Sequence, residues 1–324
     1  MPTLSDDVER ILAGDLTIML AQVTPMHGVV LTPVNNFGWD PETRSVTLTS
    51  DLAAYRKLER LERNPQVALV FHVREPGRSE GDQYVLLHGR ASFSWYPNRA
   101  ELERLLDLGE NELGPNRLGG RFWDWWLAPF FWNRVTIRVT AERLVIFDDP
   151  ACRGAATIIG TPLPDDLPAR QKPPGNGIEP RVGLRRTVRQ LTQMPHLLLG
   201  WAGTDGYPVV APVRVAGATP DGITLSVPGA LQPGGQRRAG LTAHQYSDGT
   251  LGQRQAVMTG WLATADESGE LTYAPHTKLG YRLPPSRLLF RVLLGAICRI
   301  GIARARRAGV PSLARRPAIP PRGR

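Results

Sequence analysis

Apolar and polar positions alternate, or run continuously apolar, in several segments of the first half of the chain, which predicts a β-rich domain. Each segment has the length and composition of a strand and is bounded by turn residues. Helical spacing predicts helices at 52–63 and 98–107, and Asn64-Pro65 ends the first of them. Many strands with few helices favour a mostly antiparallel barrel. The strands are expected at 16–23, 28–36, 45–49, 67–73, 84–94 and 135–147.

The same order of elements occurs twice along the chain. Residues Val8–Val34 and Val188–Val213 each give a short helix, an apolar strand, a Thr-led turn and a strand ending in Pro-Val. Tyr84–Ala91 and Ala256–Ala263 are a later pair of similar segments. Two diverged copies of one β-rich domain are therefore expected. Chance similarity between alternating strands is the alternative.

Composition divides the chain into five parts. Residues 151–182 contain six prolines, which is typical of a partly extended linker. This linker separates a first domain, 1–150, from a second and diverged domain, 183–283. A basic apolar segment follows at 284–310, and residues 311–324 are expected to form a disordered tail.

Positive charge is concentrated at the C-terminal end. The net charge is +9, but eleven arginines and no acidic residue lie between Arg282 and Arg324. Subtracting these eleven charges leaves −2 for the rest, so no nucleic-acid partner is expected. Only three of the 39 basic residues are lysine, Lys57, Lys172 and Lys278. In such a chain a lone lysine is a better candidate for a specific role than an arginine.

The sequence contains no recognisable metal-binding or hydrolytic motif. The two cysteines, Cys152 and Cys298, are far apart, and the six histidines have no ligand spacing, so no metal site is expected. Few cysteines and no secretory signal favour the cytoplasm. His72 and His244 end equivalent strands of the two copies; a structural role is favoured, and contact with a ligand is the alternative.

The most specific segment is LTSDLAAYRKLERLERNPQVALVF, residues 48–71. Together with the order of strands, it resembles the pyridoxamine 5'-phosphate oxidase-like split-barrel family, which includes flavin and deazaflavin oxidoreductases. The resemblance covers roughly 16–147 well and 188–283 weakly. It implies a mostly β fold with α: two tandem FMN-binding-type split β-barrels plus a C-terminal helix.

The resemblance also implies a phosphate site. In the family a Thr or Ser closing the third strand, and a Lys or Arg at the start of the helix, bind the cofactor phosphate. Here these residues are Thr49, Ser50, Arg56 and Lys57. Hydroxyls and backbone N–H groups at a helix N-terminus suit a phosphate. The alternative is that Ser50 and Asp51 only cap a surface helix whose basic residues are solvated.

The family's cofactor ring lies along the second and third strands and the dimer partner. This implies Pro33, Val34 and Asn35 as ring contacts. The amides of Asn35 and Asn36 suit either a flavin edge or a turn before Gly38, and both interpretations stay open.

The second copy lacks the helix of the phosphate site, because SVPGALQPGGQRRAGL stands where the first copy has TSDLAAYRKLERL. The first copy is therefore the better cofactor candidate. Family members are usually homodimers with the cofactor at the interface. This chain is expected to form either an intrachain pseudo-dimer or a homodimer.

Two further segments each have more than one interpretation. Seven of the eleven residues 122–132 are aromatic, which favours core or inter-domain packing over a pocket wall or a membrane-interface patch. Tyr273–Arg282, with Lys278, is either a surface loop or, with nearby Arg254 and Trp261, a small pocket for an anion.

A helix is expected at 285–307. It is too short and too charged to span a bilayer. Its apolar side should dock on the protein near the aromatic segment, and peripheral membrane contact is the alternative. The predicted docking side consists of Leu288, Leu289, Val292, Leu293, Ala296, Ile300 and Ala303.

The sequence thus predicts a flavin- or deazaflavin-dependent oxidoreductase that acts on small organic molecules. FMN is the expected cofactor, with coenzyme F420 or haem as alternatives, and the hydride chemistry would be the cofactor's. No residue is singled out as a catalytic acid or base. The rival is a non-catalytic split-barrel module that binds haem, flavin or another ligand, or a scaffold.

Overall fold

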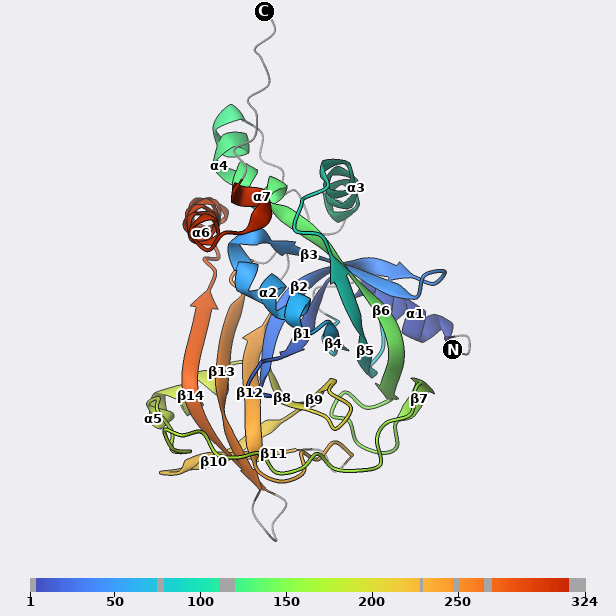
Figure 1. Cartoon of the computed structure of the whole chain (residues 1–324), viewed down its shortest axis with the longest axis vertical. Helices are drawn as coiled ribbons and strands as arrows, with labels where there is room; N and C mark the ends of the chain where they lie inside the picture. The colour runs from blue at the N-terminus through green and yellow to red at the C-terminus, as the bar shows by residue number, and fades with distance from the viewer. Residues whose placement is uncertain are drawn as a thin grey trace, which may run out of the picture.

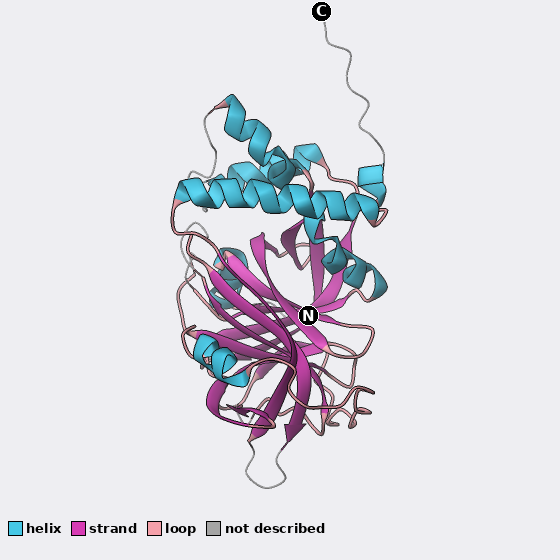
Figure 2. Ribbon diagram, turned by 90° about the vertical axis from the view of Figure 1, so that its left-hand side faces the viewer, coloured by secondary structure: helices cyan, strands magenta, loops and turns pink. Residues whose placement is uncertain are grey.

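The computed structural model describes residues 4–74, 79–110, 120–227, 230–246, 251–264 and 270–314. Two seven-stranded antiparallel sheets form its body, and several helices gather at one end (Figures 1 and 2). The mostly β fold with α that the sequence predicts is confirmed.

The first sheet closes into a barrel. Its strands are β1 (Thr17–Val23), β2 (Val29–Asp40), β3 (Ser45–Asp51), β4 (Gln66–Phe71), β5 (Tyr84–Phe93), β6 (Arg134–Phe147) and β7 (Thr157–Gly160). They run in the order β3-β2-β1-β4-β5-β6-β7, and pairing of β3 with β6 closes the ring. Strand β7 lies inside the segment predicted as a linker, so the first sheet extends beyond residue 150.

The second sheet repeats this order but stays open. Its strands are β8 (His196–Ala202), β9 (Pro208–Pro212), β10 (Arg214–Thr219), β11 (Gly222–Ser226), β12 (Arg237–Gln245), β13 (Arg254–Thr264) and β14 (Leu271–Arg282). The order β10-β11-β14-β13-β12-β8-β9 matches the first barrel with β9 and β10 as two halves of β2. Because that strand is interrupted at Val213, the ring opens there. The tandem split-barrel architecture is confirmed.

Strands β1 and β4 are buried on both faces. In β1, Ile18 and Leu20 lie in the core of the first barrel, whereas Met19 and Ala21 lie in a second core that is shared with the other sheet. Since successive side chains of a strand point to opposite faces, both faces of β1 must be apolar. This explains why residues 18–21 and 67–71 are continuous apolar runs.

Two glycines bring the copies into close contact. Gly200 of β8 and Gly240 of β12 are directly opposed partners, and both face β2. A Cβ on Gly240 would collide with the carbonyl oxygen of Val29, and a Cβ on Gly200 would lie 2.9 Å from a Val29 methyl carbon. Glycine is therefore required for the backbones to approach this closely.

A polar contact also joins the copies. Arg143 of β6 pairs with Asp205 of the second copy at 2.6 Å. His88, behind that arginine, lies 2.8 Å from the carbonyl oxygen of Pro208. The two copies therefore pack against each other through a core to which strands of both sheets contribute.

The helices cover the ends of the sheets. They are α1 (Asp6–Gly14), the 3-10 turn η1 (Leu52–Ala54), α2 (Tyr55–Arg63), α3 (Arg99–Glu110), α4 (Arg121–Trp132), α5 (Leu184–Leu191), α6 (Arg287–Arg307) and α7 (Pro311–Ala314). Ser5 caps α1 by accepting a hydrogen bond from the Val8 amide at 3.4 Å. Residues 311–324 were predicted to be disordered, and this was wrong for the four residues that form α7. Residues 315–324 lie outside the described residues.

Helix α6 docks on the protein as predicted, but by its other side. Its buried residues are Gly295, Cys298, Ile302 and Ala305. Small side chains let the helix approach the protein closely: a Cβ on Gly301 would collide with Ala53. The large apolar residues of the predicted docking side are largely exposed. Close packing of backbones, rather than hydrophobicity, selects the docked side.

Helix α4 carries the aromatic segment and is not a core element. Phe122 and Trp125 are each 60% exposed, so the favoured interpretation of this segment as core was wrong. The guanidinium of Arg299 in α6 lies over the Trp125 and Trp126 rings, 4.5 and 4.8 Å from their centroids. Stacking with arginine partly replaces burial for these rings.

We expect Gly240→Ala to destabilise the protein by about 2 kcal/mol or more, since the added methyl overpacks a rigid backbone contact. Gly217→Ala is the matched control, because a Cβ added there would have nothing within 4 Å of it. It should change the free energy of unfolding by no more than about 0.5 kcal/mol. Denaturant midpoints measure both. Equal midpoints for the two variants would show that the glycine contact is not needed.

Candidate functional site

Five polar side chains meet where β3 passes into α2, and we call them the Lys57 cluster. Thr49 and Asp51 come from β3, Lys57 from α2, Arg134 from β6 and Cys298 from α6. Asp51 and Arg134 are directly opposed across β3 and β6. Thr49 shares the face of Asp51, because residues two apart on a strand point the same way.

Hydrogen bonds hold most of the cluster in place. The Arg134 Nε donates to Thr49 Oγ1 at 3.3 Å. The Asp51 carboxylate accepts from the Ala53 amide at 2.8 Å and from Cys298 Sγ at 3.1 Å. Asp51 therefore caps η1, as one of the two sequence interpretations proposed, and it also ties α6 to the barrel.

The cluster contains more positive than negative charge. Burial, with the neighbouring Arg134 guanidinium, lowers the pKa of Lys57 to about 8, and the Asp51 carboxylate only partly offsets this. Burial raises the pKa of Asp51 itself, against the effect of Arg134. Within the described residues the Lys57 amine makes no hydrogen bond or ion pair. One carboxylate thus faces two cations.

This donor set fits an anionic group such as a phosphate. Lys57 offers an ammonium whose own neighbours do not satisfy it, and Arg134 offers a planar guanidinium. An anion placed among them would offset the burial and the like-charge repulsion that together lower the pKa of Lys57. The chemistry of the site therefore suits a phosphate better than a cation.

The structure brings some of the residues predicted for the ring contacts next to this cluster. Asn35 is directly opposite Thr49 across β2 and β3. Pro33 lies two residues before Asn35 on the same face of β2, the face whose Val29 and Leu31 pack on the second copy. Val34 instead points into the first barrel core, where it is 4% exposed.

Two of the residues predicted for the phosphate site lie apart from the cluster. Ser50 is buried on the face of β3 that also carries Leu48, and its hydroxyl lies 3.4 Å from the Asp51 carbonyl oxygen. Arg56 is exposed, and its pKa is raised by a hydrogen bond to the side chain of Tyr55. Thr49 and Lys57 are the predicted phosphate residues that the structure places together.

Sequence reasoning missed Arg134 and Cys298 as members of the cluster. Arg134 reaches it only because β3 pairs with β6, and Cys298 only because α6 docks on η1. No local pattern signals either contact. The one available signal was that Arg134 directly precedes the strand predicted at 135–147.

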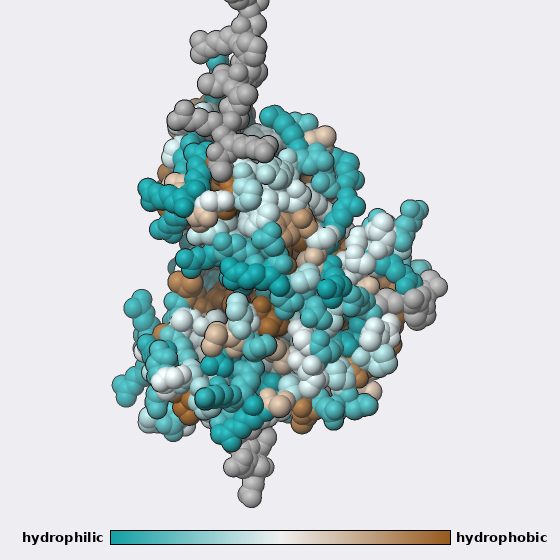
Figure 3. Space-filling view, viewed as in Figure 1, coloured by the Kyte–Doolittle hydropathy of each residue, from teal (hydrophilic) through white to brown (hydrophobic). Residues whose placement is uncertain are grey.

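A hydrophobic hollow lies near the cluster. Figure 3 shows it below the hydrophilic band over α2 and beside the upper part of β14. On β14, Leu279 and Tyr281 share one face and are 76% and 42% exposed. The neighbouring strand β13 packs on β2 of the first barrel. Elements of both copies therefore surround the hollow.

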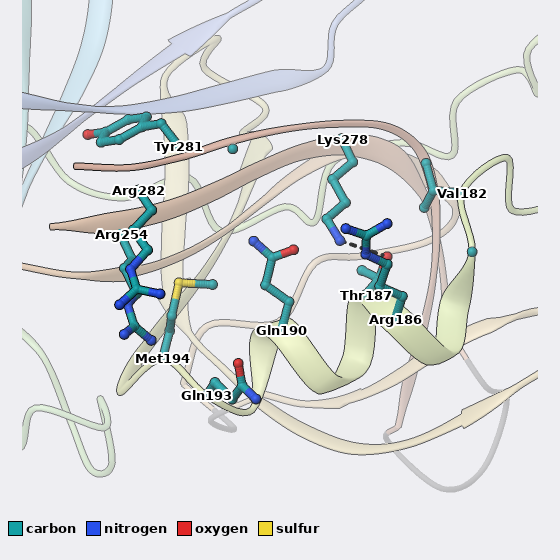
Figure 4. A pocket seen from close by; sticks show the side chains of 12 residues that line it. Val182, Arg186, Thr187, Gln190, Gln193, Met194, Arg254, Lys278, Tyr281 and Arg282 are labelled. Carbon is teal, nitrogen blue, oxygen red and sulfur yellow. Dashed lines mark hydrogen bonds between the residues drawn. The ribbon is translucent and has the colours of Figure 1, made fainter. Parts of the chain in front are cut away.

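The second copy carries a separate basic cavity of about 710 Å³ between α5 and the ends of β13 and β14 (Figure 4). Arg254 and Arg282 line one end of it and are opposed across the two strands. Lys278 lines the other end, near Arg186, and donates a hydrogen bond to Thr187 Oγ1 at 3.2 Å. A cavity is therefore present where the sequence predicted an anion pocket around Lys278 and Arg254.

Trp261 does not line this cavity. It is 1% exposed and belongs to the packed interior. Anion binding in this cavity stays a prediction. Its lining includes Arg186 of α5 and Arg282 of β14 but not Trp261.

Three histidines meet between the copies. The Nε2 atoms of His72 and His244 lie 2.8 Å apart, and the rings of His196 and His244 stack with centroids 5.2 Å apart. A contact between two ring nitrogens needs one donor and one acceptor, so at least the accepting ring is neutral. Burial, together with His196, lowers the pKa of His72 to about 3, and burial lowers the pKa of His244 well below its usual value.

Among the residues that the structure describes, no group of three His, Cys, Asp or Glu side chains is arranged to hold a metal ion. The three histidines pack against one another, with His72 and His196 half-buried and His244 fully buried.

Comparison with solved structures returns proteins of the split-barrel type. One is a Clostridium acetobutylicum protein related to general stress protein 26, of the pyridoxinephosphate oxidase family: it is 14% identical, with a TM-score of 0.31, over 45% of this chain and 85% of its own. General stress protein 26 of Bacillus anthracis is 16% identical, with a TM-score of 0.31, over 47% of this chain and 93% of its own.

A conserved hypothetical protein of Mycobacterium tuberculosis is 19% identical, with a TM-score of 0.34, over 45% of this chain and 86% of its own. No protein-family profile matches the chain, and no curated protein matches it. The similarity is one of fold.

We expect acid to destabilise the protein from about pH 6.5 downward. The unfolded chain binds protons at histidine below that pH, whereas buried His72, with its pKa near 3, does not. At pH 5 this costs about 2 kcal/mol for one such histidine. Denaturant midpoints at pH 7.5 and pH 5 measure the loss.

His72→Asn should lose less stability between these two pH values than the wild type loses. His27→Asn, at an exposed turn position, is the matched control and should keep the wild-type pH dependence. If His72→Asn keeps it as well, the buried histidine is not the source.

Proposed function

We propose that the protein binds one flavin-type cofactor, with its phosphate at the Lys57 cluster, and acts as an oxidoreductase of small organic molecules. FMN is the first candidate. Coenzyme F420 and haem are the alternatives, and their absorption spectra distinguish them from FMN. The observation that carries the proposal is the half-buried Lys57 amine, which, among the described residues, shares the single Asp51 carboxylate with Arg134.

The cluster would hold the phosphate in two ways. Lys57 and Arg134 would supply charge-assisted hydrogen bonds, and the Thr49 hydroxyl, now bonded to Arg134 at 3.3 Å, would turn to the same group. Asp51 is not a phosphate ligand, because its charge is negative. It would instead keep the cations and α6 in position.

The ring would lie along the outer face of β2, past Pro33 and Asn35, toward the hydrophobic hollow between the copies. Asn35 offers an amide, and the hollow offers an apolar surface that excludes water. When bound, a flavin supplies the hydride chemistry. What this chain's residues contribute is binding, orientation and exclusion of water.

The rival function is binding without catalysis, by the same fold and the same cluster. Both functions require the cofactor to bind, so cofactor binding is tested first. Turnover of an added electron donor by the loaded protein then separates an oxidoreductase from a binding module.

We expect Lys57→Met to raise the Kd for FMN about 10- to 150-fold, because a charged hydrogen bond contributes roughly 1.5–3 kcal/mol. Quenching of flavin fluorescence on titration measures this. The pKa of Lys57 is about 8 without a ligand. The affinity of the wild type should therefore fall as the pH rises above that value, since the ammonium is lost.

Lys172→Met is the matched control. Lys172 is exposed in the segment between the copies, and its removal changes the net charge equally. Unchanged FMN affinity in Lys57→Met, or an equal loss in Lys172→Met, would remove the Lys57 cluster as the phosphate site.

A further inference from the structure

Helix α6 presents a continuous apolar face to solvent, which we call the outer face. Leu289 is 59% exposed and Ile300 is 54% exposed. In the view of Figure 2, α6 lies across the helical end of the molecule with no other element in front of it. Exposed apolar patches of this kind mark interaction sites. The outer face consists of Leu288, Leu289, Val292, Leu293, Ile297 and Ile300.

The outer face is exposed because the opposite side of α6 is already engaged. Cys298 donates to Asp51, and Gly301 packs on Ala53. The carbonyl oxygen of Arg291 accepts from Trp126 Nε1 at 3.2 Å. Rolling the helix to bury its large residues would break these contacts. The apolar face is therefore a fixed part of the folded surface.

Aromatic rings extend this surface onto α4. Phe122 and Trp125 are each 60% exposed. Trp125 adjoins α6, because the Arg299 guanidinium lies 4.5 Å from its ring centroid. Tryptophan, with an apolar body and one N–H donor, is favoured where an apolar phase meets water.

The charged residues of α6 itself are all arginines. Arg287 stands at one end of α6, and Arg304, Arg306 and Arg307 stand exposed at the other. The sequence from 282 to 324 contains no acidic residue. A complementary partner must therefore be apolar at its centre and negative around it.

We propose that the outer face binds the surface of an anionic lipid bilayer, with α6 lying in the plane of the interface. Apolar side chains would enter the acyl boundary and the arginines would contact the headgroups. No helix among the described residues is long and apolar enough to cross a membrane, and none needs to. A second copy of the chain fits less well, because α6 has no acidic residue to pair with its partner's arginines.

The test is sedimentation of the purified full-length protein with lipid vesicles. We expect binding to vesicles that contain phosphatidylglycerol and none to vesicles of phosphatidylcholine alone. Leu289→Ser/Ile300→Ser should weaken binding at least tenfold. Arg304→Gln/Arg307→Gln should weaken it about fivefold for each charge removed, and 0.5 M salt should weaken the wild type in the same direction.

The matched control is Met26→Ser/Leu167→Ser. These two apolar residues are 63% and 66% exposed and lie away from α6, so vesicle binding should be unchanged. Thermal midpoints of all variants should match the wild type, since each position is exposed. This keeps a loss of binding distinct from a loss of folding.

Three results would overturn the proposal. One is absence of binding to anionic vesicles. Another is binding that Leu289→Ser/Ile300→Ser leaves intact. The third is a dimer in solution that this variant converts to monomers, which would assign the outer face to a second copy of the chain.

Discussion

The close approach of β2 to β8 and β12 at Gly200 and Gly240 is the contact on which the rest of the structure depends. Without side chains at these positions, Val29 and its neighbours pack directly on the second sheet. Strands β1, β2 and β4 can then contribute to two cores at once. The same contact places β13 beside β2, and so it determines the hollow in which both copies take part.

The Lys57 cluster has a cost in stability. A lysine whose pKa is lowered to about 8 destabilises the folded state at neutral pH, because the unfolded chain carries the same charge in water. Asp51 and the contact from Cys298 only partly offset this. Structures retain such arrangements where a ligand supplies the missing charge. Helix α6 therefore has two roles, since one side supports the cluster and the other faces solvent.

Much of the fold could be predicted from local patterns. The pattern predicted a strand at 67–73, and the continuous apolar run 67–71 within it follows from burial on both faces. The repeat predicted a second barrel, although the break at Val213 had no signal in the pattern. The scarcity of lysine singled out Lys57 from sequence alone. It is one of three lysines in the chain and follows two hydroxyl residues near the start of a predicted helix, which suggested a specific binding role.

The rest depended on contacts between distant parts of the chain. Arg134 joins Asp51 only through the pairing of β3 with β6. Asn36 could not be separated from Asn35 by sequence, yet its amide donates to the Leu12 and Asp15 carbonyl oxygens at 2.8 and 3.0 Å and is structural. In α6 the apolar spacing correctly identified a continuous apolar face, but the sequence predicted that this face would be buried. The structure instead buries the opposite side, whose small residues allow closer packing.

The most direct measurement is native mass spectrometry of the purified full-length chain, alone and after incubation with FMN, coenzyme F420 and haem. We expect one complete cofactor site per chain, because the helix that carries Lys57 belongs to the first copy and has no equivalent among the described residues of the second. The expected species is therefore a single chain with one bound flavin-type cofactor. A chain that takes up none of the three, or two molecules of one, would contradict this expectation.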